Sequence, residues 1–281
     1  MNTTVQSLSS GPKALLRRAY PLVPVLHRYL VMQLIRRDIR SRYQGSIIGL
    51  GWTMLYPLLI LGAYTFVFRS VFKAKWPGGG DSTAEFALQV FAGLVIFNLF
   101  GELIGRAPRL VLEQPNLVKR VVFPLEVLAW VGVGTAMFHA VLALAVLLMA
   151  LVWTGAPITP WILTTPLVFA ACVPVLLGLA WLLAAFGVFI RDIAHAVGPA
   201  VSMLLFLSPV LFPAKALPAY LAAALWMNPL TMPIENLRRV LIEGRAPDWQ
   251  TLGIYTLAGL VFAWLSYRLF ERLRPAFADE L

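Results

Sequence analysis

Ionisable side chains inside long apolar stretches are the residues of this chain whose types and spacing could do chemistry. His139 lies within one apolar run, and Glu102 precedes Arg106 by four residues near the end of another. A histidine at that depth could relay protons, or it could stay neutral and form hydrogen bonds between helices. Glu102 and Arg106 would share one helical face, so we interpret them as a structural ion pair rather than as catalysts.

The residue sets that most enzymes need are absent from the sequence. There is no G-x-x-x-x-G-K-[ST] phosphate loop, so the chain cannot be argued to hydrolyse ATP alone. The acids are scattered, with no D-x-D pair to hold a metal and a sugar diphosphate. The three histidines and the one cysteine do not have metal-ligand spacing. We therefore expect a non-enzymatic protein with no catalytic residue, no metal and no cofactor of its own.

The composition indicates a membrane protein. Of the 281 residues, 60% are hydrophobic and 13% are charged, whereas a soluble domain has about 25% charged residues. With 13 acids and 23 bases the chain cannot cover itself with a polar surface, so apolar surface must face lipid. The net charge of +10 does not indicate nucleic acid as a partner, because the bases lie between apolar runs. Anionic lipid headgroups and orientation in the membrane explain them better.

Six apolar runs are long enough, or nearly so, to cross a bilayer. They are 47–68, 86–105, 127–153, 161–190, 197–213 and 251–267. The fifth is short and contains Pro199, Pro209 and Pro213, so we expect it to be kinked or broken. With the N-terminus in the cytoplasm, 16 Lys and Arg fall on the cytoplasmic side and 7 outside. The sequence therefore predicts an all-α integral membrane protein with six transmembrane helices and both termini in the cytoplasm.

The segment 26–43 predicts a basic amphipathic helix that lies in the cytoplasmic membrane interface. Its apolar half holds Leu30, Val31, Leu34, Ile35 and Ile39, and its polar half holds Gln33, Arg36, Arg37 and Arg40. Asp38 falls in the middle of the apolar half, where a lone carboxylate would be costly in lipid. Arg42 follows at i+4 and can pair with it. We therefore expect this face to meet protein as well as lipid; the alternative is a plain membrane anchor.

Two further segments are predicted to be more than connections. Residues 106–124 form a cytoplasmic loop with a short helical stretch before Pro115, which suits a docking surface; the alternative is a plain basic loop. Residues 214–250 are predicted to face outward, with two short apolar helices around Asn228-Pro229. That pattern favours a re-entrant hairpin that dips into the outer leaflet, and the alternative is a hairpin lying on the membrane surface.

Aromatic side chains gather along the first two apolar runs. Trp52 and Tyr56 lie one turn apart on one face of the first run, and Tyr64 follows two turns later. Aromatic rings stack on sugar faces while their edges make polar contacts, so a path lined by rings suits a glycan. For any single one of them, an interfacial belt or helix packing is the simpler interpretation.

Four stretches of the sequence, in order, resemble the permeases of ABC-2-type exporters. The closest resemblance is to O-antigen and teichoic-acid exporter permeases, and capsule exporters are more distant. The stretches are 42–52 with 56–58 and 64–68, then 116–124, 191–193 and 226–230. The resemblance covers nearly the whole chain, and the order and spacing of the motifs agree with it.

The resemblance implies a cytoplasmic N-terminus with the interface helix, residues 1–46, followed by an ABC-2-type transmembrane domain, residues 47–281. It implies a homodimer that forms the channel, with two copies of a separate cytoplasmic ABC ATPase beneath it. ATP and magnesium would be bound by that partner. The substrate would be a lipid-linked polysaccharide of O-antigen or capsular type, moved across the bacterial inner membrane. Six spans could hardly surround a polymer, which is an independent reason to expect an oligomer.

The resemblance also suggests roles for particular positions. Arginines of the interface helix would attract the lipid diphosphate, because guanidinium matches phosphate oxygens bidentately. Two cytoplasmic loops would receive the ATPase stroke, and the outward hairpin would gate the outer end. The candidates are Arg36, Arg37, Arg40 and Arg42 for entry; Trp52, Tyr56 and Tyr64 for the glycan path; Glu113, Asn116, Lys119, Arg120, Arg191 and Asp192 for ATPase coupling; and Trp226, Asn228 and Pro229 for the outer gate.

Other functions stay open from the sequence. One is an ABC-2 permease for a drug or simple lipid, against which the long interface helix and the predicted hairpin argue. Another is a membrane-embedded polyprenyl-phosphate-dependent transferase, which would need clustered acids or histidines near one membrane face. A third is a non-catalytic membrane scaffold of the same pathway.

Overall fold

The computed structural model of the chain is helical throughout the part that it describes. It describes residues 27–45, 49, 51–67, 76, 83–115, 123–156, 158–214 and 225–280, and no strand occurs among them. The elements are α2 (Arg28–Tyr43), α3 (Gly51–Thr65), α4 (Thr83–Arg106), η3 (Ala107–Arg109), α6 (Val127–Trp153), η4 (Pro160–Thr164), α7 (Thr165–Phe189), α8 (Ile193–Leu207), α10 (Thr231–Leu241), α11 (Trp249–Leu273), η6 (Arg274–Ala276) and α12 (Phe277–Glu280). The predicted all-α class is confirmed.

Four helical stretches are long and apolar enough to cross a membrane. They are Thr83–Arg109, Val127–Trp153, Pro160–Phe189 and Trp249–Ala276. They coincide with the second, third, fourth and sixth predicted runs. The first and fifth runs correspond to α3 and α8, of 15 residues each. Such helices are about 22 Å long, less than the roughly 30 Å of a hydrocarbon core. Six complete spans and the orientation of the chain therefore stay predictions.

The end of α8 explains why the fifth span is short. Pro199 is accommodated inside the helix, but the chain turns to an extended conformation at Ser208, directly before Pro209. Proline has no backbone N–H to continue the helical hydrogen bonds. The predicted break is therefore confirmed, and it lies at the end of the helix rather than in its middle.

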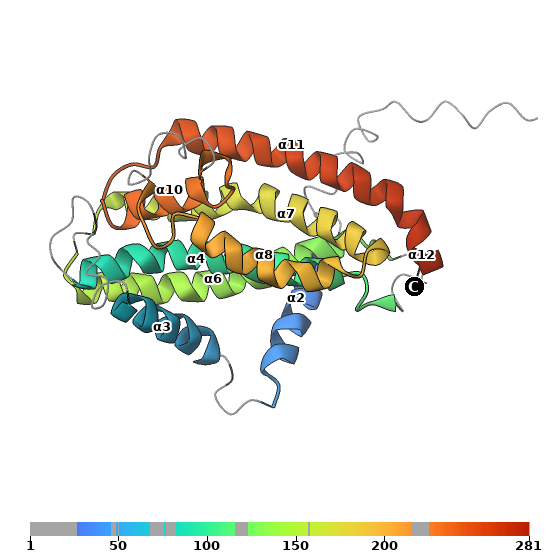
Figure 1. Ribbon diagram of the computed structural model, residues 1–281, viewed down its shortest axis with the longest axis horizontal. Coiled ribbons are helices and arrows are strands. Elements are labelled where there is room, and N and C mark those ends of the chain that lie inside the picture. The colour runs from blue at the N-terminus through green and yellow to red at the C-terminus, as the bar shows by residue number, and fades with distance from the viewer. Residues whose placement is uncertain are drawn as a thin grey trace, which may run out of the picture.

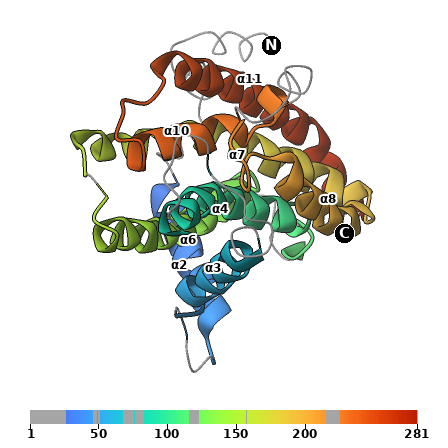
Figure 2. The same ribbon diagram turned by 60° about the vertical axis from the view of Figure 1, so that its left-hand side comes forward.

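The long helices α4, α6, α7 and α11 run side by side along the long axis of the molecule (Figure 1). The most extensive packing joins α7 to α11, followed by α4 with α6. The interface helix α2 lies at a steep angle to this bundle and contacts it through α6 (Figure 1). Helix α3 lies on the same side as α2, and α11 lies on the opposite side (Figure 2).

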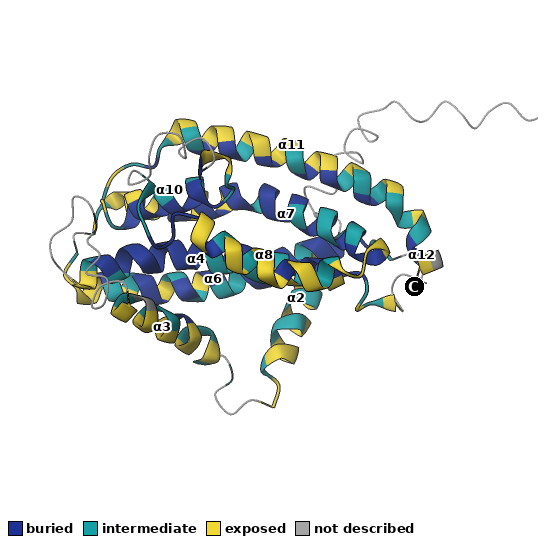
Figure 3. Cartoon of the chain, viewed as in Figure 1, coloured by how far each residue is buried: buried dark blue, intermediate teal, exposed yellow. Residues whose placement is uncertain are grey.

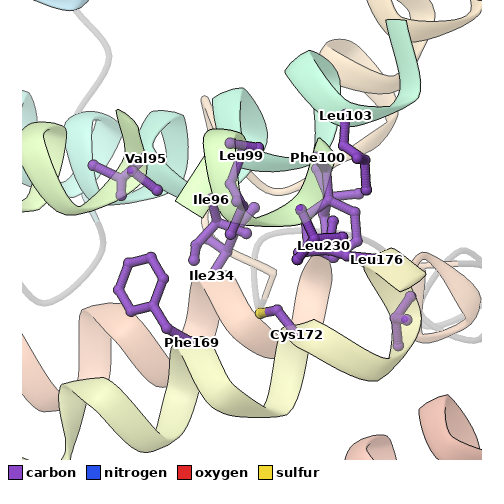
Figure 4. Close-up of a cluster of buried hydrophobic side chains, with 14 of the residues drawn as sticks. Val95, Ile96, Leu99, Phe100, Leu103, Phe169, Cys172, Leu176, Leu230 and Ile234 are labelled. Carbon is purple, nitrogen blue, oxygen red and sulfur yellow. The ribbon is translucent and has the colours of Figure 1, made fainter. Parts of the chain in front are cut away.

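The core lies where α4, α7 and α10 meet. Ile96, Leu99 and Phe100 of α4 face Cys172 of α7 and Ile234 of α10, and all five are fully buried (Figure 4). By contrast, α3, α8 and α11 expose many large apolar side chains, as the yellow faces in Figure 3 show. An apolar surface of that extent is expected for helices that face lipid or another membrane protein.

Candidate functional site: a polar cluster and cavity beside the interface helix

Helix α2 packs its apolar half on the start of α6. Val31 is buried against Val127 and Val131. One turn further, Ile35 lies over Gly134, where any Cβ atom would overlap the Ile35 side chain. The missing side chain at Gly134 therefore allows the close approach of the two helices. The prediction that this face of the interface helix meets protein is confirmed.

Asp38 lies at the centre of the contact between α2 and the bundle. Both of its carboxylate oxygens accept hydrogen bonds from Arg106, at 2.9 Å from Nη1 and 2.8 Å from Nη2. The Nε atom of Arg42 lies 3.7 Å from the same carboxylate. The predicted pair with Arg42 is therefore present, and the bidentate pair with Arg106 is the shorter one. The unfavourable exposure of Asp38 to lipid is avoided by this arrangement.

The structure replaces the predicted Glu102–Arg106 ion pair. Arg106 bonds to Asp38, and Glu102 instead accepts a 2.6 Å hydrogen bond from Nη1 of Arg42. Glu102 and Arg106 are one turn apart on α4, but each bonds to a residue of α2. Helix α2 supplies an opposite charge to each of them, so both pairs join α2 to α4.

His139 of α6 is hydrogen-bonded to α2 and α4. Its Nδ1 lies 2.8 Å from a carboxylate oxygen of Glu102, and its Nε2 lies 2.8 Å from the hydroxyl of Tyr43. The Tyr43 hydroxyl is also 2.6 Å from Oγ1 of Thr53. A neutral imidazole satisfies every group: Nδ1–H donates to Glu102, Tyr43 donates to Nε2, and Thr53 donates to Tyr43. This arrangement supports the interpretation of His139 as a histidine that forms hydrogen bonds between helices.

A cavity of about 410 Å³ lies beside this polar cluster, between α2, α3, α4 and α6. Trp52 and Tyr56 of α3 line one part of it, and both side chains are exposed. Arg42, Asn98 and His139 line other parts. The structure thus brings a predicted entry residue and two predicted glycan-path residues to one cavity. Aromatic rings next to charged and amide groups can stack on a sugar ring and bond to its hydroxyls.

A second cavity, of about 460 Å³, lies between α2 and the start of the loop that follows α4, the predicted first cytoplasmic loop. Arg37 and Glu113 both line it, so an entry candidate and a coupling candidate lie close together. Arg36 and Arg40 are exposed on α2 and line neither of these two cavities. The four arginines therefore do not form a single cluster, because two turn toward the bundle and two stay on the outside of the helix.

The remaining coupling candidates are only partly described. Asn116, Lys119 and Arg120 lie outside the described residues, as does much of that loop. Arg191 and Asp192 form an exposed turn between α7 and α8. The side chain of Tyr64 likewise falls outside the description.

The three outer-gate candidates lie on one turn before α10. The amide of Asn228 donates to the carbonyl of Leu207 at 3.1 Å and to Oγ of Ser208 at 2.9 Å. Its Oδ1 accepts from the backbone N–H of Leu230 at 2.9 Å. Asn228 therefore fastens this turn to the broken end of α8.

Trp226 and Pro229 border an apolar cavity of about 410 Å³ that α7 and α11 complete. Residues 215–224 of the predicted hairpin lie outside the described part, and its membrane depth stays a prediction.

Comparison with known proteins decides the family. Residues 29–242 match the model of the ABC-2 type transporter family. The chain belongs to the ABC-2 type transporter family. The resemblance to ABC-2-type permeases that the four motifs indicated is thereby confirmed, and family and apolar helices together make this a multi-pass membrane protein.

Two curated relatives cover this ABC-2 transporter nearly from end to end. The chain is 28% identical over 264 residues to the O-antigen export system permease protein RfbA of Myxococcus xanthus, covering 92% of this chain and 99% of the relative. It is 21% identical over 253 residues to a protein of the same name from Klebsiella pneumoniae, covering 90% and 95%.

Arg238 is a buried residue of this ABC-2 transporter that the sequence analysis did not single out. Its side chain is 2% exposed. Its guanidinium donates to the backbone carbonyls of Gln89, Pro209 and Val210, at 3.0, 2.6 and 2.7 Å. The last two carbonyls belong to the irregular backbone after α8, which has no helical partner. One arginine therefore satisfies the backbone at the break and ties it to α4 and α10.

Three neighbours complete the Arg238 site. Glu235 accepts from Nη1 at 3.2 Å and supplies an opposite charge. The ring of Trp76 lies 4.5 Å from the guanidinium carbon, within cation–π range. Gly93 provides room for the guanidinium, since a Cβ atom at this position would lie 3.0 Å from Nη2 of Arg238. The sequence gives only a weak indication of this site. Pro209 and Pro213 predict backbone carbonyls without helical partners, but no neighbouring residue indicates which donor binds them.

Proposed function

We propose that this protein is the membrane subunit of an ABC exporter that moves a lipid-linked polysaccharide across the bacterial inner membrane. Two copies would form the channel, and two copies of a separate ATPase would drive it. The names of the relatives support this substrate class, because they are O-antigen export permeases of nearly the same length. The observation in the molecule that carries the proposal is the cavity shared by Trp52, Tyr56 and Arg42.

The substrate would enter beside α2. Arg36 and Arg40 are exposed there and can attract a diphosphate from the membrane interface, while Arg37 lines the neighbouring cavity. Guanidinium groups suit this role because each can donate two parallel hydrogen bonds to phosphate oxygens. Arg42 is already bonded to Glu102, so its role in entry would be to border the aromatic cavity rather than to hold the diphosphate alone.

The glycan would follow the aromatic wall of α3. Stacking on Trp52 and Tyr56 needs no particular sugar, whereas Asn98 can donate and accept hydrogen bonds with hydroxyl groups. Such contacts are individually weak, which suits a polymer that must move past them. At the other end, the turn held by Asn228 would gate release.

Energy would come from the partner. ATP and its magnesium would be bound by the ATPase subunits, and the loops near Glu113 and Arg191 would receive their movement. Replacing Lys119 and Arg120 together by Glu should weaken this docking without preventing membrane insertion. Unchanged co-purification of the ATPase with that variant would remove the loop from the proposed interface.

The experiment that tests the function is deletion of the gene followed by location of the polymer with an antibody or a lectin. We expect polymer on its lipid carrier inside the cytoplasmic membrane and a bare cell surface, restored by the wild-type gene. Loss of polymer both inside and outside would argue for a synthetic enzyme or a scaffold. Normal surface polymer would argue against export by this protein.

A further inference from the structure

The segment that follows α11 packs back onto the bundle. Phe277 of α12 is fully buried. Its ring centre lies 5.3 Å from that of Phe270 and 5.9 Å from that of Phe189, the last residue of α7. Phe189 precedes the exposed turn at Arg191 by two residues. Residues 274–280 therefore contact the base of the second cytoplasmic loop.

The same segment holds the return arm of the first cytoplasmic loop. Arg274 donates from Nη2 to the carbonyl of Phe123 at 2.9 Å, and its Nη1 lies 3.1 Å from a carboxylate oxygen of Glu126. Phe123 and Glu126 lie at the end of that loop, directly before α6. The backbone carbonyl of Glu126 also accepts from Nε1 of Trp181 on α7, at 3.1 Å. The return arm is thus bonded to α7 and to the segment after α11.

The outgoing arm of the first loop contacts α7 as well. Pro108 of η3 lies against Gly187, where a Cβ atom would overlap the Pro108 carbonyl oxygen. Gly187 lies only four residues before Arg191. The bases of the two loops are therefore in direct contact on one side, and residues 274–280 join them on the other.

We propose that residues 274–280 are a brace that makes the two cytoplasmic loops move as one body with α7 and α11. This inference rests on the proposed function, because it requires an ATPase that acts at these loops. Arg274 and Phe277 are positioning residues: they contact neither substrate nor nucleotide. Arg274 bonds to the return arm of the first loop, and Phe277 packs on Phe189 at the end of α7, two residues before the second loop. The peptide between Arg274 and Phe277 is too short to absorb a relative movement. A stroke delivered to either loop then reaches α7 and α11, the most extensively packed helix pair in the described chain.

The ion pair fits a positioning role better than a purely stabilising one. The side chains of Arg274 and Glu126 are 30% and 13% exposed. Ion pairs with that access to solvent contribute little to folding stability. Their geometry nevertheless fixes the direction of the loop, because the guanidinium bonds a backbone carbonyl and a side chain at once.

The test compares Arg274→Gln, Phe277→Ala and the double variant with wild type, each purified with its ATPase. Three quantities are measured: ATPase bound per permease, ATP hydrolysed, and polymer exported per ATP. We expect normal ATPase binding and nearly normal hydrolysis. Polymer exported per ATP should fall about 2- to 30-fold, the range that known coupling mutations span. Arg272→Gln is the matched control, because Arg272 is exposed on the last turn of α11, two residues before Arg274.

Conservative variants guard against simple misfolding. Phe277→Leu keeps an apolar side chain in the buried position, and Arg274→Lys keeps the charge beside Glu126, so each should recover part of the coupling. The brace would be overturned if hydrolysis and export fell in parallel, which leaves the polymer exported per ATP unchanged. Loss of ATPase binding in a correctly inserted variant would overturn it as well. Failure of the proposed function would look different, since wild-type protein itself would then bind no ATPase or export no polymer.

Discussion

Asp38 and Arg106 are 68 positions apart in sequence and are joined by two parallel hydrogen bonds of 2.8 and 2.9 Å. Asp38 lies on α2, and Arg106 is the last residue of α4, directly before the predicted first cytoplasmic loop. Any movement of that loop therefore reaches the helix beside which the substrate is proposed to enter.

Asp38→Ala should loosen α2 from the bundle. The substitution leaves Arg106 without its carboxylate, and we expect a loss of about 1 kcal/mol in stability, because the pair is partly exposed. Thermal unfolding in detergent, followed by tryptophan fluorescence, measures the change. The charge exchange Asp38→Arg with Arg106→Asp should recover part of the loss. Arg36→Ala on the exposed side of α2 is the control, and an equal effect there would contradict the assigned role of the pair.

Tyr43→Phe should disturb the hydrogen bonds around His139. The change removes the hydrogen-bond partner of both Nε2 of His139 and Oγ1 of Thr53, which stay partly buried, so we expect a cost of about 1–2 kcal/mol. Combining it with Thr53→Val should cost less than the sum of the single changes, since both remove the same 2.6 Å bond. Strict additivity of the two unfolding free energies would show that the hydroxyls do not interact.

Arg238→Ala should be the most damaging single substitution considered for the part of the bundle around α10. It leaves the backbone carbonyls of Pro209 and Val210 buried without their donor, and it removes the bond to Gln89, at a cost of about 3 kcal/mol or more. Arg238→Lys should rescue little, because one ammonium group cannot reproduce the three separate donors, Nε, Nη1 and Nη2, that reach the three carbonyls. Membrane-inserted protein and its melting temperature in detergent report the effect. Arg239→Ala is the neighbouring control, since Arg239 is exposed and bonds one carbonyl, that of Ala246.

Trp52→Ala and Tyr56→Ala should reduce surface polymer while leaving the protein folded, because both rings are already exposed at the cavity. Tyr56→Phe keeps the ring face and should retain most export. Stacking on aromatic rings contributes roughly 1 kcal/mol per contact, so each alanine variant should lose about fivefold in the export rate. Leu59→Ala tests exposure alone: Leu59 is exposed on the same helix and does not line this cavity. Equal losses at Leu59 and Trp52 would argue against a glycan path here.

Arg36→Ala with Arg40→Ala should reduce export without disturbing assembly, because both side chains are exposed and line neither the aromatic cavity nor the cavity bordered by Arg37 and Glu113. The difference in export between wild type and the double variant should be smaller at high ionic strength, because salt then screens the attraction of the diphosphate in wild type too. The assay is export into vesicles at two salt concentrations, with ATPase co-purification as the assembly readout. Normal export by the double variant would remove these arginines from the entry site.

What the sequence determined by itself is local along the chain. Apolar length predicts the four long helices, the alternation of apolar and basic residues predicts α2, and Pro209 predicts the end of α8, because each of these depends on neighbouring residues only. The Asn228-Pro229 turn belongs to the same class. The family could be recognised from four short motifs in order, since their spacing is a property of the sequence.

Only the tertiary structure decided which polar groups meet. Glu102 and Arg106 were paired in the sequence analysis because one turn separates them, yet each bonds to α2 once Ile35 and Gly134 bring that helix close. Arg238 finds carbonyls 149, 29 and 28 positions away. Buried charges take whatever partners the packing of helices brings within hydrogen-bond distance, because leaving them unpaired costs several kcal/mol. That choice depends on how the helices cross, which no local pattern of residues records.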